Sequence, residues 1–429
     1  PAWSRRGLWN RAYYEARVPG VPTMLLELLS HQNFADMRYG SDPRFKFLVS
    51  RAVYKGILRY ISSQYGLPYV VQPLPVESLA VQFAEGGKAA VTWSPVMDSL
   101  ETTAAPTGYV VYTRIDDGGF DGRYVDKPCL LTAQEPGRIY SYKVTAVNEG
   151  GESFPSETVA ACRMPDEKGT VLIVNGFDRV SAPLSVRADS LAGFYTDIDG
   201  GVPDRQDISF IGAQHVFDMQ MAKCEVDSIA LGACACDYET EVIGGNTFDY
   251  SALHGRSVAG AGYSFCSASV RAVERGEVSP DGYSAVDLIL GEQRSTTIGR
   301  GVTGYAFKTF SPELQAVLRR YMAGGGALFV SGSYVATDLW TGENTSDDDR
   351  RFAEEVLHYT YDGGRAAQRG RVRVVTSHPG FSRDEYRYVN EYRPDRYRVE
   401  SPDALRPAGA GAFSVMRYVE NGRTAGVAS

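Results

Sequence analysis

The spacing of hydrophobic and polar positions changes twice along the chain and divides it into three parts. In residues 1–66 a short apolar run precedes a long pattern with apolar residues three and four positions apart, which predicts a helix. In residues 76–164 apolar and polar positions alternate between turn residues, which predicts β-strands. In residues 170–429 apolar runs alternate with helical patterns. We therefore expect a multidomain chain of α/β and β parts.

The first part centres on Glu27. Residues 23–27 are predicted to form a short buried strand, with Glu27 at the carboxyl end, the edge at which open α/β sheets bind ligands. The alternative is a structural carboxylate that pairs with a nearby arginine such as Arg17. Asn33 lies in the polar turn that follows, where it either caps the turn or contacts a substrate. Asp42-Pro43 then predicts the start of an amphipathic helix that packs on a sheet.

The second part is bounded by two predicted linkers. Residues 67–75 are rich in proline, and residues 165–169 are short and polar. Between them, strands at regular spacing predict a β-sandwich over residues 76–164, with Trp93 in its core.

The third part, residues 170–429, has the alternating pattern of a largely parallel, three-layer α/β domain. Its tail after Arg371 is predicted to be rich in strands and to end in a hairpin around Asn421-Gly422. Since the chain starts at Pro1 and its last strand stops abruptly, we expect both ends to lie inside a larger protein. The predicted strands are 170–174, 208–211, 285–290 and 327–330, and the predicted helices are 264–275, 312–321 and 348–358.

Composition narrows the possible partners. A net charge of −8 argues against nucleic acid, and no apolar run approaches the roughly 18 residues of a membrane span. The 27 tyrosines are typical of proteins that handle sugars, because the ring stacks while the hydroxyl stays in water. The six cysteines include no C-x-x-C pair, so we expect mostly free, buried thiols and no metal site in this chain.

Candidate nucleophiles lie at the end of the predicted strand 327–330, where Ser331 and Ser333 flank Gly332. No G-x-S-x-G motif surrounds them, so a tight turn whose hydroxyls bond the backbone is the alternative to a substrate contact. The pair Cys234 and Cys236 has no histidine partners, and Asp347 to Asp349 lack calcium-loop spacing, so we expect structural thiols and an exposed helix start.

Two segments resemble known families. The pattern Val-Pro-Thr-Met-Leu-Leu-Glu27, followed by Asn33, Asp36 and a helix through Gly56, resembles the C-terminal end of zinc-dependent N-acetylmuramoyl-L-alanine amidases. This resemblance implies that Glu27 is the general base. It also implies zinc in the parent protein and none in this fragment, because the family's ligands lie upstream of Pro1.

The segment from Tyr140 to Ser156 resembles the end of a fibronectin type III module. In that family the hydroxyl of the tyrosine matched by Tyr140 ties its strand to the preceding loop. The element from Leu328 to Tyr334 is similar to a strand and turn of glutamine-amidotransferase-like folds. Together with Asn246-Thr-Phe-Asp-Tyr250, these cues resemble secreted Bacteroidetes proteins labelled as xanthan lyases or amidases.

These resemblances imply three functional hypotheses. The first is a fragment of a secreted cell-envelope hydrolase, an amidase that acts on peptidoglycan, inactive on its own and located outside the cytoplasm. The second is a non-catalytic protein that binds a cell-wall or other envelope glycan. The third is a polysaccharide lyase, which needs a base beside a group that neutralises a uronate carboxylate, and the sequence alone shows no such combination.

Overall fold

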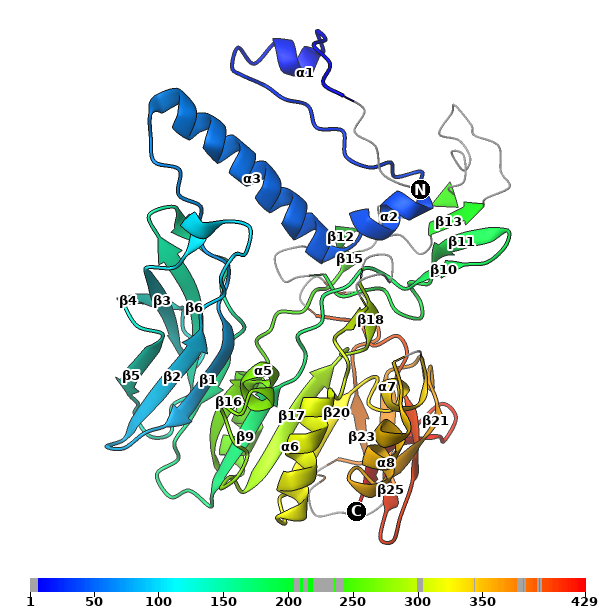
Figure 1. Ribbon diagram of the computed structural model, residues 1–429. Coiled ribbons are helices and arrows are strands. Elements are labelled where there is room, and N and C mark those ends of the chain that lie inside the picture. The colour runs from blue at the N-terminus through cyan, green and yellow to red at the C-terminus, as the bar shows by residue number, and fades with distance from the viewer. Residues whose placement is uncertain are drawn as a thin grey trace.

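Figure 1 shows the computed structural model of the chain, in which more of the described residues lie in strands than in helices. The described residues are 7–203, 209–210, 215–218, 235–236, 242–298, 304–342, 344–375, 381, 383–391, 393 and 396–429. None of the helices in these ranges is both long enough and apolar enough to cross a membrane.

The N-terminal part contains three helices, α1 (Tyr14–Arg17), α2 (Phe34–Gly40) and α3 (Pro43–Tyr65). The predicted start of α3 is confirmed: Pro43 is its first residue, and the Asp42 carboxylate accepts a hydrogen bond from the backbone N–H of Arg44 at 2.9 Å. A proline fits here because its missing N–H would have had no helical partner.

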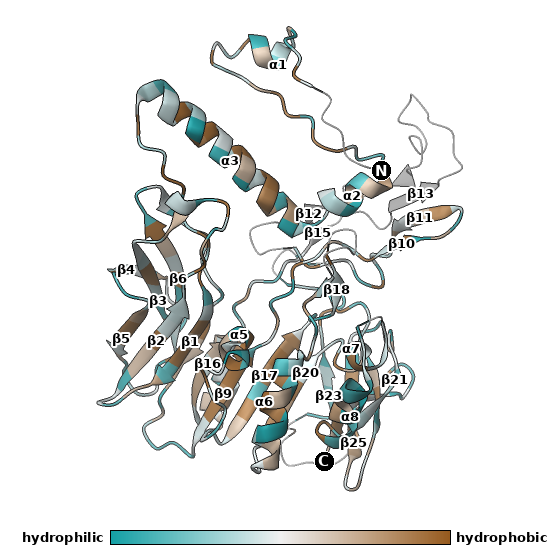
Figure 2. Ribbon diagram, viewed as in Figure 1, coloured by the Kyte–Doolittle hydropathy of each residue, from teal (hydrophilic) through white to brown (hydrophobic). Residues whose placement is uncertain are grey.

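The predicted strand at 23–27 is wrong. This segment is extended but unpaired with any described strand, and Met24, Leu25 and Leu26 are 52–68% exposed. An apolar run forms a strand only when a neighbouring strand completes its hydrogen bonds. Helix α3 also differs from expectation, because apolar side chains such as Leu48 and Ile57 are more than half exposed, as the brown bands along α3 in Figure 2 illustrate.

Helix α3 is attached to the β-sandwich by a buried ion pair. The Arg51 guanidinium donates to Asp98 Oδ2 at 2.9 and 3.1 Å and to the carbonyl of Gln72 at 3.0 Å. Both charged side chains are less than 10% exposed.

The β-sandwich has a clear core. Trp93 is 5% exposed and packs edge-on against Tyr109, and the Tyr140 hydroxyl accepts a hydrogen bond from the N–H of Glu135 in the preceding loop. One sheet contains β1 (Glu77–Phe83), β2 (Lys88–Ser94) and β5 (Cys129–Ala133). The other contains β3 (Gly108–Ile115), β4 (Asp121–Val125), β6 (Tyr140–Asn148), β7 (Gly151–Glu152) and β8 (Val159–Ala161), and a short 3-10 turn spans Thr102–Ala104.

Four parallel strands follow in the order β20-β17-β9-β16. Apolar side chains on one face pack against α5 and α6, and those on the other face pack against α4. The strands are β9 (Thr170–Asn175), β16 (Ser264–Ser269), β17 (Ala285–Gly291) and β20 (Leu328–Gly332), and the helices are α4 (Ser251–Gly260), α5 (Val270–Glu274) and α6 (Pro312–Ala323).

The predicted helix over 264–275 is therefore half wrong. Its first six residues form the strand β16, and only the rest is helical. Every residue of β16 is buried, so its sequence lacks the alternation of apolar and polar residues that marks a half-exposed strand. The buried hydroxyls of Ser264 and Ser267 accept hydrogen bonds from backbone N–H groups of neighbouring residues.

The sandwich and the parallel strands share one continuous sheet. Strand β1 pairs antiparallel with β16, Val81 opposite Ser267, and this makes seven strands in the order β20-β17-β9-β16-β1-β2-β5. The Ser267 hydroxyl accepts from the N–H of Ala160 at 2.6 Å and donates to its carbonyl at 2.7 Å. The predicted linker 165–169 therefore connects two parts, the sandwich and the parallel strands, that are also hydrogen-bonded directly to each other.

The C-terminal tail forms a six-stranded sheet beside the parallel strands (Figure 1). The predicted hairpin at Asn421-Gly422 is present, and Gly422 has the positive φ of 74° that favours glycine. The strands of this sheet, in spatial order, are β21 (Tyr359–Gly363), β24 (Ala404–Pro407), β26 (Thr424–Ala428), β25 (Phe413–Tyr418), β22 (Arg371–Val374) and β23 (Glu385–Arg387).

Shorter elements complete the described chain. Helices α7 (Thr337–Trp340) and α8 (Asp347–Glu355) lie between the two sheets in sequence. The small strands are β10 (Ser185–Arg187), β11 (Leu191–Phe194), β12 (Ser209–Phe210), β13 (His215–Asp218), β14 (Ala235–Cys236), β15 (Val242–Ile243), β18 (Thr296–Thr297) and β19 (Tyr305–Ala306).

Candidate functional site

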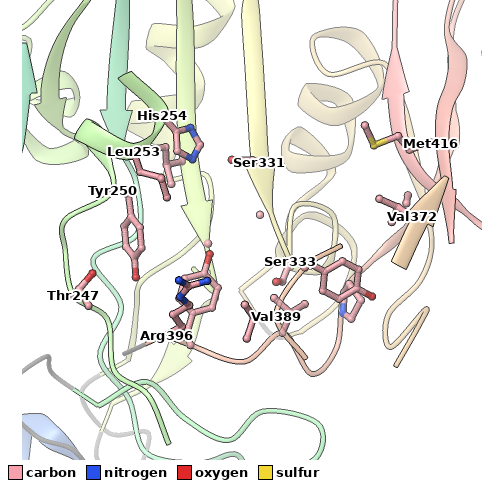
Figure 3. Close-up of a pocket in the computed structure, with 18 of the residues that line it drawn as sticks. Thr247, Tyr250, Leu253, His254, Ser331, Ser333, Val372, Val389, Arg396 and Met416 are labelled. Atoms are coloured by element: carbon pink, nitrogen blue, oxygen red, sulfur yellow. The ribbon is translucent and has the colours of Figure 1, made fainter. Parts of the chain in front are cut away.

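A cavity of about 620 Å³ opens at the carboxyl ends of β17 and β20, between α4 and residues of the C-terminal part (Figure 3). The carboxyl edge of parallel strands is where ligands bind in open α/β sheets, because the loops there are free to diverge. Its lining combines four tyrosines with polar and apolar side chains: Tyr250, Tyr388, Tyr397, Tyr418, Thr247, Asp249, His254, Ser331, Ser333, Arg396, Leu253, Ile289, Val372, Val389, Val399 and Met416.

A histidine and a carboxylate meet on one wall of this cavity. His254 Nδ1 of α4 lies 2.8 Å from Asp287 Oδ2 of β17. The His254 side chain is 27% exposed and that of Asp287 11%, so the carboxylate stands behind the ring. An imidazole that donates Nδ1–H to a carboxylate keeps its other nitrogen, Nε2, as a proton acceptor. This pair therefore has the form of an oriented base.

Tyrosine rings form another part of the lining. Tyr397 packs edge-on against Phe177 at 5.0 Å and against Tyr250 at 6.0 Å, measured between ring centres. Burial raises the pKa of Tyr250, and it raises the pKa of Tyr388 to about 12, so both hydroxyls keep their protons near neutral pH. Neither hydroxyl makes a hydrogen bond of normal geometry with a described residue. Both hydroxyls are thus buried donors at the cavity wall that lack a partner among the described residues.

The two candidate serines have different surroundings. Ser331 lies on β20 directly beside Ile289 of β17, and both line the cavity. The hydroxyl of Ser333 donates to Glu292, and its backbone N–H donates to the carbonyl of Gly291 at 2.8 Å. Ser333 is only 5% exposed, so its hydroxyl has a structural partner that Ser331 is not shown to have.

A buried charge cluster lies behind Ser333. Arg179 Nη2 contacts Asp199 Oδ2 at 2.5 Å, and Glu292 is part of the same cluster. Burial, and then the neighbouring Glu400, raise the pKa of Glu292 well above its usual range. Burial and the charge of Asp199 raise the pKa of Glu400 to about 8. Protonated carboxyls can coexist with one another here, whereas two buried carboxylates would repel.

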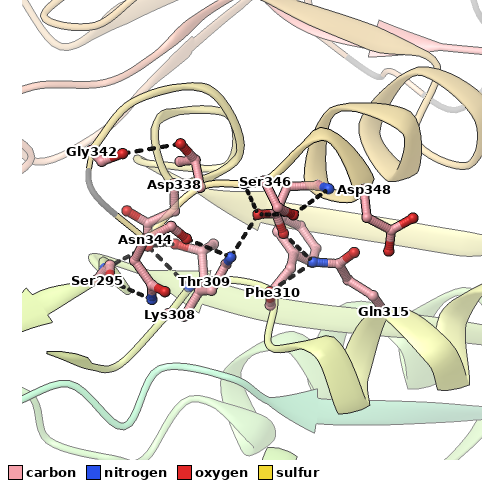
Figure 4. A network of polar contacts seen from close by, with 12 residues as sticks. Ser295, Lys308, Thr309, Phe310, Gln315, Asp338, Gly342, Asn344, Ser346 and Asp348 are labelled. Carbon is pink, nitrogen blue, oxygen red and sulfur yellow. Dashed lines mark hydrogen bonds and ion pairs between the residues drawn. The ribbon is translucent and has the colours of Figure 1, made fainter. Parts of the chain in front are cut away.

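A second polar network fixes the helices that support β20 (Figure 4). Asp349 at the start of α8 accepts hydrogen bonds from Lys308 Nζ at 2.8 Å and from Gln315 Nε2 at 2.6 Å, and it forms a capping box with Ser346. Asp338 accepts from both the N–H and the hydroxyl of Thr309. The aspartates at 347–349 therefore begin a helix, as expected, and Asp349 serves the fold.

The structure separates the predicted site residues. Glu27 lies in the exposed segment before α2, far in sequence from the cavity residues, and its role as a general base stays a prediction. Asn33 caps α2 by accepting from the N–H groups of Ala35 and Asp36. Ser331 and Ser333 both line the cavity.

Sequence reasoning missed His254 and Asp287. The available signal was a carboxylate inside the apolar run of β17, since an aspartate between Val286 and Leu288 needs a partner when it is buried.

Within the described ranges no three His, Cys, Asp or Glu side chains gather closely enough to hold a metal ion. Cys162 and Cys266 are free and buried as predicted, whereas Cys129 is exposed, because it starts the edge strand β5. The side chains of Cys234 and Cys236 lie outside the described residues.

Comparison with known proteins supports one part of the chain. A family model described as fibronectin type III domain matches residues 74–161, which confirms the predicted sandwich family for that part. No curated protein matches the chain. Solved structures also match part of the chain. They include "Structure of FN3tt mut" (21% identity, 21% of this chain and 94% of that chain, TM-score 0.18) and "Myokine structure" (18%, 22% and 99%, 0.19). A third is the fibronectin type-III domain of human fibronectin type III domain containing protein 3 (22% identity, 22% and 89%, 0.19).

Proposed function

We propose that this chain is the glycan-binding part of an extracytoplasmic cell-envelope protein, and that the tyrosine-lined cavity holds the glycan. The observation that carries the proposal is the lining itself: aromatic faces beside unpaired hydroxyl donors in a space of about 620 Å³. Ligand pockets are usually of this size, roughly 300–1,000 Å³. A sugar ring presents C–H faces that pack on tyrosine and hydroxyls that hydrogen-bond to polar groups.

The cavity lining holds one arginine, Arg396, and one aspartate, Asp249. Arg396 lies among the lining residues and is labelled in Figure 3, so a uronate or a peptide carboxylate would find a cation there. The whole chain carries a net charge of −8, which disfavours nucleic acid as the anion.

The fibronectin module supports the cavity. Arg114 of β3 donates to both carboxylate oxygens of Asp249 at 2.9 and 3.1 Å, and Asp249 lines the cavity. A bidentate arginine–carboxylate contact fixes the orientation of the two side chains as well as the distance between them. The module therefore acts as a scaffold that holds one rim of the proposed binding site.

The test is binding of soluble glycans to the whole chain by isothermal titration calorimetry. We expect binding of muropeptides or of uronate-containing oligosaccharides. We expect Tyr250→Phe, which keeps the ring and removes the hydroxyl, to weaken binding about 2- to 10-fold, the value of one hydrogen bond of about 0.5–1.5 kcal/mol. Tyr124→Phe is the matched control, because Tyr124 is 60% exposed on β4 and does not line the cavity.

Two outcomes would contradict the proposal. One is the absence of binding across both glycan classes. The other is equal weakening by Tyr250→Phe and Tyr124→Phe, which would place the binding surface elsewhere.

A further inference from the structure

Three chemically complementary side chains share one face of the parallel sheet. Residues two positions apart on a strand point to the same face, so Asp287 and Ile289 of β17 face the same way. Ile289 packs in the apolar cluster that contains Ala252 of α4. Ser331 of β20 pairs with Ile289 in parallel register and therefore also faces α4. Asp287 and Ser331 thus stand on the α4 side, on neighbouring strands.

Helix α4 places a histidine beside Asp287. His254 Nδ1 bonds Asp287 Oδ2 at 2.8 Å, and His254 and Ser331 both line the cavity (Figure 3). Asp287 Oδ1 has no hydrogen-bond partner among the described residues, so the side-chain hydrogen bond of this carboxylate is the one to His254. Ser333 differs, because its hydroxyl is committed to Glu292.

We propose that Ser331, His254 and Asp287 are nucleophile, base and positioning carboxylate of an acyl-transfer site, and that the cavity hydrolyses a short O-acyl ester carried by a sugar. This activity goes beyond glycan binding. A nucleophile, a base and a group that orients the base are recognised by geometry, whatever their order in the chain. The apolar side chains of Leu253 and Ile289, which line the cavity beside His254, suit a short acyl chain.

The steps balance without a further reactant except water. Ser331 Oγ attacks the ester carbonyl carbon while His254 Nε2 takes the hydroxyl proton. The C–O bond to the sugar breaks, and the departing alkoxide receives that proton from His254. Water, deprotonated by the same nitrogen, then attacks the acyl-serine, and the carboxylic acid leaves as Ser331 recovers its proton. Arg396 supplies positive charge to the cavity in which the oxyanion forms.

The experiment treats the whole chain with a fluorophosphonate probe, locates the adduct by mass spectrometry, and measures p-nitrophenyl acetate hydrolysis. We expect an adduct on Ser331 and a loss of hydrolysis of at least about 100-fold in Ser331→Ala and His254→Ala. Ser279→Ala, the control, keeps both within about threefold, because Ser279 is exposed and does not line the cavity. Asp287→Asn lowers kcat with KM retained, because it orients the base and does not contact substrate.

Labelling at Ser333, no labelling at Ser331, or hydrolysis that survives Ser331→Ala overturns the proposal. So does release of unsaturated uronate that depends on His254 and not on Ser331, since that result assigns His254 to elimination. Glycan binding is scored separately, by calorimetry on the unaltered chain. A protein that is labelled at Ser331 but binds no glycan therefore refutes the proposed function and leaves the acyl-transfer site standing.

Discussion

Ser267 joins the fibronectin module to the parallel sheet, and its replacement by alanine tests whether the two parts unfold together. The hydroxyl makes two hydrogen bonds with Ala160, at 2.6 Å to the N–H and 2.7 Å to the carbonyl, and both residues are fully buried. The change removes one oxygen and leaves both backbone groups of Ala160 without that partner. A buried polar group without a partner costs about 1–3 kcal/mol, so Ser267→Ala is expected to cost roughly 2–4 kcal/mol.

Hydrogen exchange in increasing denaturant, read by mass spectrometry, resolves the two parts. In the parent chain, peptides from β6 and from β17 should lose protection at the same denaturant concentration, because they belong to one cooperative unit. In Ser267→Ala both midpoints should fall and should separate. The matched control is Ser153→Ala: Ser153 also bonds two backbone groups, Ala146 N–H at 2.9 Å and Phe154 carbonyl at 2.8 Å, but within the module.

The control should lower the midpoints without separating them. An Ser267→Ala chain within about 0.5 kcal/mol of the parent would refute the hydrogen-bond reasoning. A cost of the expected size with coincident midpoints would show that the coupling runs through the shared apolar core and not through this serine.

Two further predictions concern buried charge. Asp98→Ala leaves the buried Arg51 without its carboxylate, so we expect a loss of about 3–5 kcal/mol and faster tryptic cleavage within α3, while Asp117→Ala at an exposed pair should change neither. Burial raises the pKa of Glu157 from 4.5 to about 8, so the folded chain keeps a proton that the unfolded chain releases, and stability should fall as pH rises from about 4.5 to about 8. Glu157→Gln should reduce this fall in urea unfolding; an unchanged pH dependence would contradict it.

Local patterns predicted the elements whose buried residues can be recognised within a short stretch of sequence. The amphipathic spacing of residues 312–321 corresponds to α6, and the apolar run 285–290 corresponds to β17, because one buried face or one buried run is visible in a short window. The alternation in the fibronectin module was equally readable. The run at 23–27 has the same apolar character but no described partner strand, and it is not a strand.

The candidate site depended on distances in sequence that periodicity does not reach. Ser331 was predictable as a residue at the end of a strand. His254 and Asp287 are 33 residues apart, and only the packing of α4 on β9 and β16, beside β17, brings them together. The central strand β16 was not predicted, because serines stand where a buried strand normally has large apolar side chains.

The shared sheet bears on whether the fibronectin module is portable. Such modules are often treated as domains that fold independently. Here β1 is an interior strand of a seven-stranded sheet. Cutting the chain near residue 165 would uncover the backbone edge of β1 together with the apolar residues Ile139, Ala160 and Cys162, which now pack against Val171 and Phe265. An uncovered, apolar strand edge recruits other chains, so the excised module is expected to self-associate where the intact chain stays dispersed.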